Sequence, residues 1–420
     1  MAEKKSRRGH NEGSIYRTAD GTWRGAAFLG VSPEGKPIRK YVTGKTKAET
    51  LGKVKKILAD HERGIPIARK DQTVAEFFDR WLEDVVRVNK RPRTYEAYES
   101  LVRVHIIPSI GRHKLNKLTA QHIQQMLTAK QDEGLAGRTL INIRAIVRAA
   151  LNQAMRWDLI GRNVATLTDA PQPDEFEAKP LSPAEVTAFL KQVKDDRLAA
   201  LYVVTVWLGL RQGEVFGLRW QDVDLDSEDA ELRIVYQLQY RKVDSITDRQ
   251  LRAMSEHDQE RVKEVRDANE HHKLPFLVSV KTEKSRRALP LPAPVVNALK
   301  LHRDAQKIER ALAGRHWKGD GWDLVFCSTV GTPLDSSNVT KQYKAHLETA
   351  KLGDRRFHDL RHSCGTFLAS RNVHPRIAMD ILGHSQIATT MNTYTHVDMA
   401  MRREALNAIS DVFEEQNAAS

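Results

Sequence analysis

The chain has 420 residues, 40% of them hydrophobic and 29% charged, a balance typical of a globular protein with two or three domains. Its longest apolar run, residues 198–210, is too short to span a bilayer, and the charged N-terminus lacks the apolar stretch of a secretory signal. The two cysteines, Cys327 and Cys364, exclude a disulfide framework and a C-x-x-C metal pair. We therefore expect a cytoplasmic protein with no membrane association.

The net charge of +13 is concentrated at the start of the chain. Residues 1–70 contain 17 Lys and Arg against 7 Asp and Glu, a net of +10, whereas the remaining residues contribute only +3. A basic block on a small segment is what binding to a phosphate backbone requires. A disordered solubilising tail is the alternative interpretation of such a block.

Residues 1–66 are expected to form a small DNA-binding domain. Turn-rich stretches divide residues 14–44 into three short segments, which predicts a three-stranded sheet, and residues 45–64 predict a helix. Such a sheet can lay its strands in a DNA groove. The aromatic residues expected to pack against the helix are Trp23, Phe28 and Tyr41. The basic residues expected to contact DNA are Arg24, Arg39, Lys40 and Lys45.

Residues 71–168 are expected to form an all-helical domain. Apolar residues recur at a spacing of three to four, as in amphipathic helices, in the segments 73–86, 93–110, 119–131 and 138–160. Arg91 and Arg93 are candidates for a DNA-facing surface, although scattered arginines usually only solvate a helix. Residues 169–180 contain three prolines and several acidic residues, which predicts an interdomain linker.

Residues 181–398 are expected to form a mainly helical domain with a small antiparallel sheet. A capping box begins a helix at Ser182, and the apolar run at 198–210 predicts a buried helix. Residues 231–240 alternate between apolar and polar side chains, which predicts one strand, and two further strands follow. We interpret the charged stretch 240–273 as a solvated insertion, with a helix on an extended hairpin. The predicted fold class is multidomain α+β.

The sequence HDLRH, residues 358–362, has two possible functions. On a helix His358 and His362 lie one turn apart and could hold a metal ion, as in the zinc-binding pattern H-E-x-x-H. His358 and Arg361, three positions apart, could equally face a phosphate. A zinc helix of this type requires Glu beside the first histidine and a third ligand, and here Arg361 would place a cation near the metal. We therefore expect no metal and interpret His362 as a structural residue.

Four separated segments between residues 209 and 396 together resemble the tyrosine recombinase family, also called phage-integrase-like site-specific recombinases. The matching positions are Arg211 in G-L-R-x-G-E, Lys281 in K-T-x-x-S-x-R, His358 and Arg361 in H-x-L-R, His384 in L-G-H, and Tyr394 ten residues later. The first two predicted domains also resemble the arm-binding and core-binding domains of the family, although less specifically.

The resemblance implies a DNA cleavage reaction without a cofactor or a metal. In the family a tyrosine oxygen, here that of Tyr394, attacks a backbone phosphate and forms a 3′-phosphotyrosyl link with release of a 5′-hydroxyl. Another 5′-hydroxyl reverses the reaction, so that strands are exchanged. Arg211 and Arg361 are expected to grip the non-bridging phosphate oxygens, where the transition state concentrates negative charge.

The remaining site residues are expected to move protons or to hold the phosphate. A phenol has a pKa of about 10, so the tyrosine needs help to lose its proton, and His358 is placed to assist as a base or as a phosphate donor. Lys281 is expected to protonate the leaving oxygen, and His384 to donate to the phosphate. Glu214 is expected to hold Arg211. The residues expected at the DNA backbone beside Lys281 are Arg286 and Arg287.

The expected partners are double-stranded DNA attachment sites, a homotetramer on DNA, and an accessory directionality or DNA-bending factor. The basic N-terminal domain favours an integrase that integrates or excises a mobile element. The alternatives are a non-catalytic, sequence-specific DNA-binding regulator and a type IB topoisomerase. Residues 399–420 predict a C-terminal helical tail, which would pack either on its own domain or on a neighbouring subunit.

Overall fold

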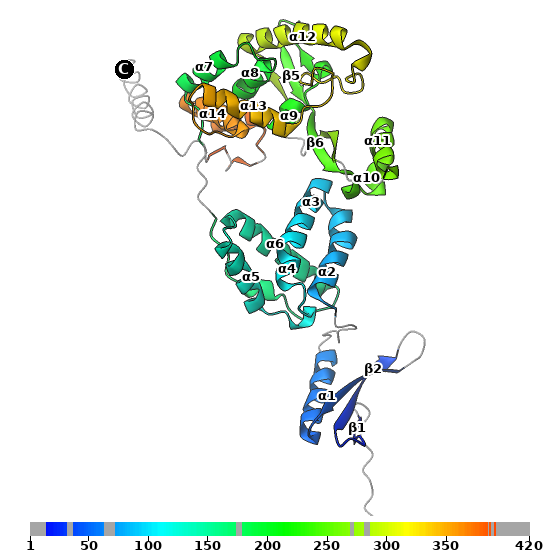
Figure 1. The fold of residues 1–420 in the computed structure, drawn as a ribbon. Helices are drawn as coiled ribbons and strands as arrows, with labels where there is room; N and C mark the ends of the chain where they lie inside the picture. The colour runs from blue at the N-terminus through cyan, green and yellow to red at the C-terminus, as the bar shows by residue number, and fades with distance from the viewer. Residues whose placement is uncertain are drawn as a thin grey trace, which may run out of the picture. The chain divides into compact units, whose positions relative to one another are not determined.

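The computed structural model describes residues 14–31, 37–62, 72–173, 179–268, 273–280, 286–384, 386–387 and 390–391. The chain forms two compact units, residues 1–175 with 244–253, and residues 176–243 with 254–420 (Figure 1). None of the helices in the described ranges is long and apolar enough to cross a membrane.

The first unit begins with the predicted three-stranded sheet. Strands β1 (Ser14–Arg17), β2 (Trp23–Val31) and β3 (Pro37–Gly44) are antiparallel in the order β1-β2-β3, and helix α1 (Lys47–Glu62) packs against them. Gly25 explains how closely the helix approaches, because a Cβ at this position would lie 2.6 Å from a methyl carbon of Val54 on α1. The sheet and the helix agree with the sequence prediction.

Two of the three aromatic residues expected beneath α1 lie on the opposite face. Strand alternation places Trp23 and Gly25 of β2 on the side that faces the helix, so Ala26 and Phe28 lie on the open side. Tyr41 pairs with Ala26 and therefore also lies on the open side. Phe28 is 40% exposed and Tyr41 48% exposed. Only Trp23 faces α1, where the Lys47 ammonium lies 5.8 Å from its ring centroid. The expectation was therefore wrong for Phe28 and Tyr41.

The predicted helical domain follows in the same unit. Its helices are α2 (Val74–Trp81), α3 (Pro92–Leu101), α4 (Ile107–Ile110), α5 (Ala120–Asp132) and α6 (Gly137–Arg156). A capping box at Thr73 starts α2, with Glu76 bonding back to the backbone of Thr73. The segments Leu82–Arg87 and Val102–Ile106 are π-helical turns that continue α2 and α3. Their apolar faces close one core that includes Phe77, Phe78, Ile106, Ile143 and Leu151.

The second unit is built around a buried helix. Its helices are α7 (Pro183–Gln192), α8 (Ala199–Leu208), α9 (Gln212–Phe216), α11 (Glu256–Asp267), α12 (Ala293–Ala313), α13 (Ser336–Thr349), α14 (Phe357–Ser370) and α15 (Pro375–Leu382). Helix α8 is apolar on nearly all sides, as the sequence predicted, and it packs against both α12 and α14 (Figure 1).

The predicted strand 231–240 is in fact two strands that belong to different sheets. Strand β5 (Glu231–Ile234) lies between β4 (Val223–Asp224) and β8 (Arg287–Pro290). Strand β6 (Tyr236–Lys242) instead pairs with β7 (Lys273–Ser279) as a separate hairpin. The chain changes sheets at Val235, whose carbonyl accepts a hydrogen bond from the Val280 amide.

The charged insertion after β6 is a hairpin with helices, as expected, but it is not wholly solvated. Helix α10 (Asp248–Arg252) and α11 lie between the two hairpin strands, and Ile246 and Val262 are fully buried. Residues 244–253 belong to the first unit, where the Arg87 guanidinium donates to the carbonyl of Asp244 at 2.6 Å. The charged stretch is therefore partly buried, through Ile246 in the first unit and Val262 in the second.

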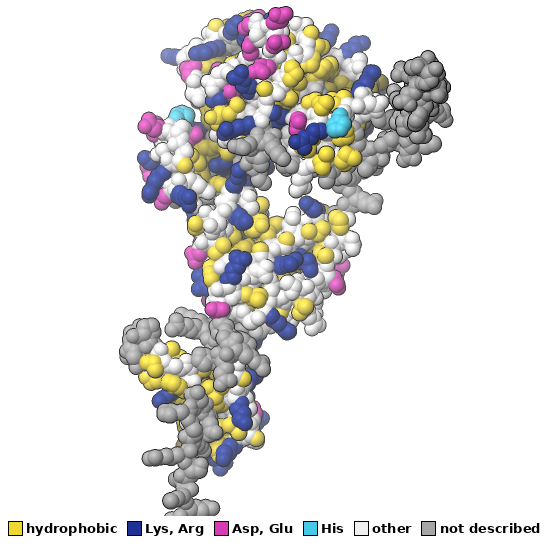
Figure 2. Space-filling model, turned by 180° about the vertical axis from the view of Figure 1, so that it is seen from behind, with side chains coloured by type: hydrophobic (Ala, Val, Ile, Leu, Met, Phe, Trp, Pro, Cys, Tyr) yellow, Lys and Arg dark blue, Asp and Glu magenta, His cyan; other side chains and the backbone are white. Residues whose placement is uncertain are grey.

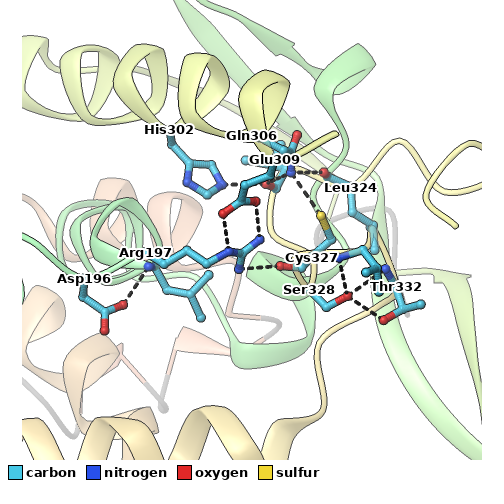
Figure 3. Close-up of polar contacts among 12 residues, drawn as sticks. Asp196, Arg197, His302, Gln306, Glu309, Leu324, Cys327, Ser328 and Thr332 are labelled. Carbon is cyan, nitrogen blue, oxygen red and sulfur yellow. Dashed lines mark hydrogen bonds and ion pairs between the residues drawn. The ribbon is translucent and has the colours of Figure 1, made fainter. Parts of the chain in front are cut away.

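A partly buried polar network fixes the start of α8 against α12 (Figure 3). The Arg197 guanidinium donates two hydrogen bonds to the Glu309 carboxylate, at 2.6 and 2.8 Å, and a third to the carbonyl of Cys327 at 2.7 Å. The Gln306 amide donates to the Leu324 carbonyl at 3.2 Å and to the Cys327 sulfur at 3.1 Å. Since α8 has ten residues, about 15 Å of helix separates this network from Gly209 at its other end.

Candidate active site

Arg211 lies in the short connection between α8 and α9, where two hydrogen bonds fix its guanidinium. Gly209 ends α8 in the left-handed conformation, with φ +59°, and Arg211 is the N-cap of α9. Its Nη1 donates to Oε1 of Glu214 at 2.7 Å, and its Nη2 donates to the carbonyl of Gly383 at 2.7 Å. The side chain is still 37% exposed, so one edge of the fork can meet a ligand.

Arg361 comes from α14 and is more deeply buried than Arg211. The residue is only 3% exposed, and its Nη1 donates to the carbonyl of Gly209 at 2.6 Å. Its Nη2 has no hydrogen-bond partner within the described part of the chain. Burial and the nearby Arg211 lower the pKa of Arg361 to about 9. A buried cationic donor without a partner is costly unless an anion completes it, so this position is suited to an anion.

Two histidines lie close to these arginines. His358 precedes Arg361 by one helical turn and is exposed at the surface of α14; the protein around its ring, together with His362 and Arg361, lowers its pKa to about 4. His384 follows the turn that ends α15, and its Nδ1 lies 2.8 Å from the hydroxyl of Thr390. Burial, Arg361 and Arg211 lower the pKa of His384 to about 4. Both imidazoles are therefore neutral near pH 7, so each ring has one N–H that can donate and one nitrogen that can accept a hydrogen bond.

The two histidines of HDLRH are adjacent but are surrounded by cations. The rings of His358 and His362 have centroids 4.9 Å apart and are nearly perpendicular. Arg361 and Arg356 both act to lower the pKa of His358. Within the ranges that the structure describes, no group of three His, Cys, Asp or Glu side chains is arranged to hold a metal ion.

Arg287 lies inside the site and not on the DNA-facing surface where the sequence placed it. Its side chain is 7% exposed and forms an ion pair with buried Glu214, with Nη2 3.1 Å from Oε2. The physical reason is strand alternation, because Arg287 points to the same side of β8 as buried Leu289. That alternation was a usable sequence signal for its burial. Nothing in the sequence indicated that Glu214 would be its partner.

The structure brings together Arg211, His358, Arg361 and His384 from three separated segments, since His358 and Arg361 both belong to α14. Lys281 and Tyr394 lie outside the described residues, as does the tail 399–420. The sequence did not indicate the carbonyls of Gly209 and Gly383 as arginine acceptors, because a backbone acceptor leaves no trace in residue type.

Most of the basic residues expected at DNA are on the surface. Arg24 and Arg39 lie on the open face of the N-terminal sheet, where the Arg24 guanidinium covers the ring of Tyr41 at 4.8 Å from its centroid. Lys40, opposite Ala27, belongs to the other face. The other exposed members of the set are Lys45, Arg91, Arg93 and Arg286. Figure 2 shows Lys and Arg side chains spread over this side of the first unit, with acidic side chains mostly at its edges.

The chain matches two family descriptions. Residues 179–401 match the phage integrase family, and residues 73–130 match the phage integrase, N-terminal SAM-like domain. An integrase of Streptomyces ambofaciens is 32% identical, over 89% of this chain and 88% of its own length. A tyrosine recombinase XerC-like protein of Caldanaerobacter subterraneus subsp. tengcongensis is 29% identical, over 93% of this chain and 96% of its own length.

Solved structures share the fold at lower identity. The Tn1549 transposon integrase in complex with transposon right end DNA has a TM-score of 0.62 at 20% identity, and the match covers 81% of this chain and 100% of that one. A lambda integrase tetramer bound to a Holliday junction has a TM-score of 0.54 at 16% identity, covering 92% and 96%. Since one family match covers more than half of its residues, the chain belongs to the phage integrase family and is a tyrosine recombinase.

Proposed function

We propose that this protein is a site-specific DNA recombinase that integrates or excises a mobile element through a 3′-phosphotyrosyl intermediate. The observation that carries the proposal is the buried Arg361 guanidinium, whose Nη2 has no partner among the described residues, next to the half-fixed fork of Arg211. Two such forks can hold the non-bridging oxygens of one phosphate and remain charged throughout the reaction.

The arginines are preorganised for a transition state that is more negative than the substrate. Each is fixed by at least one bond to a backbone carbonyl, at 2.7 Å for Arg211 and 2.6 Å for Arg361, so little reorganisation is needed when charge develops. Loss of one such donor typically lowers a rate by about 100- to 1,000-fold, or about 3 kcal/mol. Most of the rate enhancement is therefore assigned to this pair.

Proton transfers are assigned to the remaining residues. His358 and His384, with pKa values lowered to about 4, are neutral and able to accept a proton or to donate an N–H to the phosphate. Tyr394 is the proposed nucleophile and Lys281 the proposed acid for the leaving 5′-oxygen, both by their match to the family motifs. No step needs a metal or a cofactor.

The proposed domain roles follow the order of the chain. The open face of the N-terminal sheet carries Arg24, Arg39 and exposed aromatic rings, which suits binding to arm-type DNA sites. The helical domain 71–168 would contact the core site together with the catalytic domain 181–398. The lambda integrase tetramer on a Holliday junction supports a homotetramer as the working assembly. An accessory DNA-bending or directionality factor would complete it.

The decisive experiment detects the covalent intermediate. A nicked duplex that carries the attachment site traps the enzyme, because the released fragment diffuses away after cleavage. The expected result is a protein–DNA adduct that survives denaturing electrophoresis and disappears in Tyr394→Phe, which lacks the attacking oxygen. An adduct that persists in Tyr394→Phe overturns the nucleophile assignment, and specific binding without any adduct supports a non-catalytic regulator.

A further inference from the structure

Arg287 is a third guanidinium in the site, and no role in the reaction has yet been assigned to it. We propose that Arg287 is a positioning residue for DNA cleavage, which fixes Arg211 and His384 by holding both Glu214 and the turn Ile381–Gly383. Arg287 itself is too buried, at 7% exposure, to meet the DNA. The inference rests on the proposed function, because it concerns the step that cleaves the strand.

The first contact of Arg287 divides the Glu214 carboxylate between two arginines. Oε2 of Glu214 accepts from Nη2 of Arg287 at 3.1 Å and from the Arg211 amide at 3.0 Å, while Oε1 accepts from Nη1 of Arg211 at 2.7 Å. Burial acts to raise the pKa of Glu214, but Arg287 and Arg211 outweigh it and hold that pKa below the usual range. Without Arg287 the buried carboxylate would rely on Arg211 alone and compete with the phosphate for it.

The second contact fixes the turn before His384. Nε of Arg287 donates to the carbonyl of Ile381 at 2.8 Å. Gly383 ends α15 with φ +63°, and a Cβ at this position would lie 2.5 Å from Nη1 of Arg287, so only glycine permits this approach. The carbonyl of Gly383 accepts from Arg211, and the next residue is His384. The turn held by Arg287 therefore orients one phosphate-binding arginine and precedes one histidine of the site.

A residue that positions catalytic groups affects the rate of the reaction more than it affects DNA binding, whereas a residue that only stabilises the fold affects both. A misplacement of about 1 Å in a group that stabilises a transition state can reduce a rate about 100-fold without affecting ground-state binding. Loss of Arg287 should therefore reduce the rate of cleavage and leave DNA affinity nearly unchanged. The loss of Arg287 should also reduce the cleavage rate by a smaller factor when the phosphate carries less negative charge.

The experiment compares two variants of Arg287 with a matched control in the full chain. Arg287→Met removes the charge and keeps the length of the side chain, and Arg287→Lys keeps the charge but cannot bond Glu214 and the Ile381 carbonyl with one planar fork. Arg197→Met is the control, because it breaks a two-bonded Arg–Glu pair at the other end of α8 (Figure 3). Thermal unfolding, DNA affinity and the single-turnover rate of adduct formation are measured on the nicked duplex.

A second substrate separates positioning from general destabilisation. The same duplex with a methylphosphonate at the scissile position has one negatively charged oxygen fewer, so its transition state depends less on the arginines. With the normal phosphate we expect a rate loss of about 100-fold for Arg287→Met and about tenfold for Arg287→Lys. With the methylphosphonate each loss should shrink to within about threefold of the parent on the same substrate. Arg197→Met should lose thermal stability and keep the parental rate.

Equal losses on the two substrates, or a loss that Arg197→Met matches at equal thermal stability, overturn the positioning role. If Arg287→Met does not fold, Arg287→Lys decides by the same comparison, and a parental rate in that variant also overturns the inference. Failure of the proposed function looks different, since the parent chain itself then forms no adduct.

Discussion

The site gathers positive charge, and two of its three arginines, Arg361 and Arg287, are buried. Three arginines approach one another, and burial together with Arg211 lowers the pKa of both Arg361 and Arg287. The Glu214 carboxylate forms ion pairs with both Arg211 and Arg287. The surplus of positive charge is a cost in the free protein that a bound phosphate relieves. The residues of the site are thus more complementary to the DNA-bound state than to the free one.

This charge balance predicts a pH dependence of DNA binding. In the free protein the pKa values of His358 and His384 are lowered to about 4, below the value of about 6.5 for a solvated imidazole. A scissile phosphate attracts a proton and raises both pKa values, so binding takes up protons between pH 4 and pH 6.5. Affinity should therefore increase as the pH falls through this window, with an uptake of up to about one proton per histidine.

Calorimetric titration at pH 6 in two buffers of different ionisation enthalpy measures the proton uptake. His384→Gln should reduce the uptake, whereas His316→Gln, an exposed histidine after α12, should leave it unchanged. Identical uptake in the parent and in His384→Gln would show that the phosphate does not raise the pKa of this imidazole.

At the scale of elements, the helices were more predictable than the strands. Apolar spacing and capping residues such as Thr73 and Ser182 mark the helices locally. The change of sheets at Val235 depends on pairing with segments that lie 31 to 59 residues away along the chain, and alternation alone cannot show it. For the same reason motif spacing could select Arg211 and Arg361, while the ion pair of Arg287 with Glu214 depends on tertiary contacts.

The end of α8 is the element on which the site depends most. Gly209 has φ +59°, and a Cβ there would lie 2.5 Å from a methyl carbon of Leu382 and 3.1 Å from the sulfur of Cys364. Gly209→Ala should therefore destabilise the protein by about 2–4 kcal/mol, from backbone strain and overpacking together. It should also slow adduct formation, because the Gly209 carbonyl holds Arg361.

Thermal unfolding of Gly209→Ala and Gly134→Ala provides the comparison. Gly134 also has a positive φ, +86°, but a Cβ there would meet no atom within 4 Å. The control should lose only the strain contribution, about 1–2 kcal/mol, and should form the adduct at the parental rate. Equal effects of the two substitutions on the adduct rate would contradict a special role for the end of α8.

At the scale of the whole molecule, the basic charge is separated from the chemistry along the chain. Residues 1–70 carry most of the net charge, whereas all four described residues of the site belong to the second unit. Affinity for additional DNA sites and the cleavage of one phosphate are thus assigned to different parts of one chain. Such a division predicts that the two properties can be changed independently.

The open face of the N-terminal sheet allows a direct test of that independence. Arg24→Gln and Arg39→Gln each remove one charge from this face, while Lys55→Gln removes one from helix α1. On DNA that carries arm sites, each arginine variant should lower the slope of log affinity against log salt by about one, as expected for one lost phosphate contact. Adduct formation on a nicked core duplex without arm sites should stay at the parental rate. If Lys55→Gln changes the slope as much as the arginine variants do, the binding surface is not confined to the open face, since the charge of the whole domain then acts as a unit.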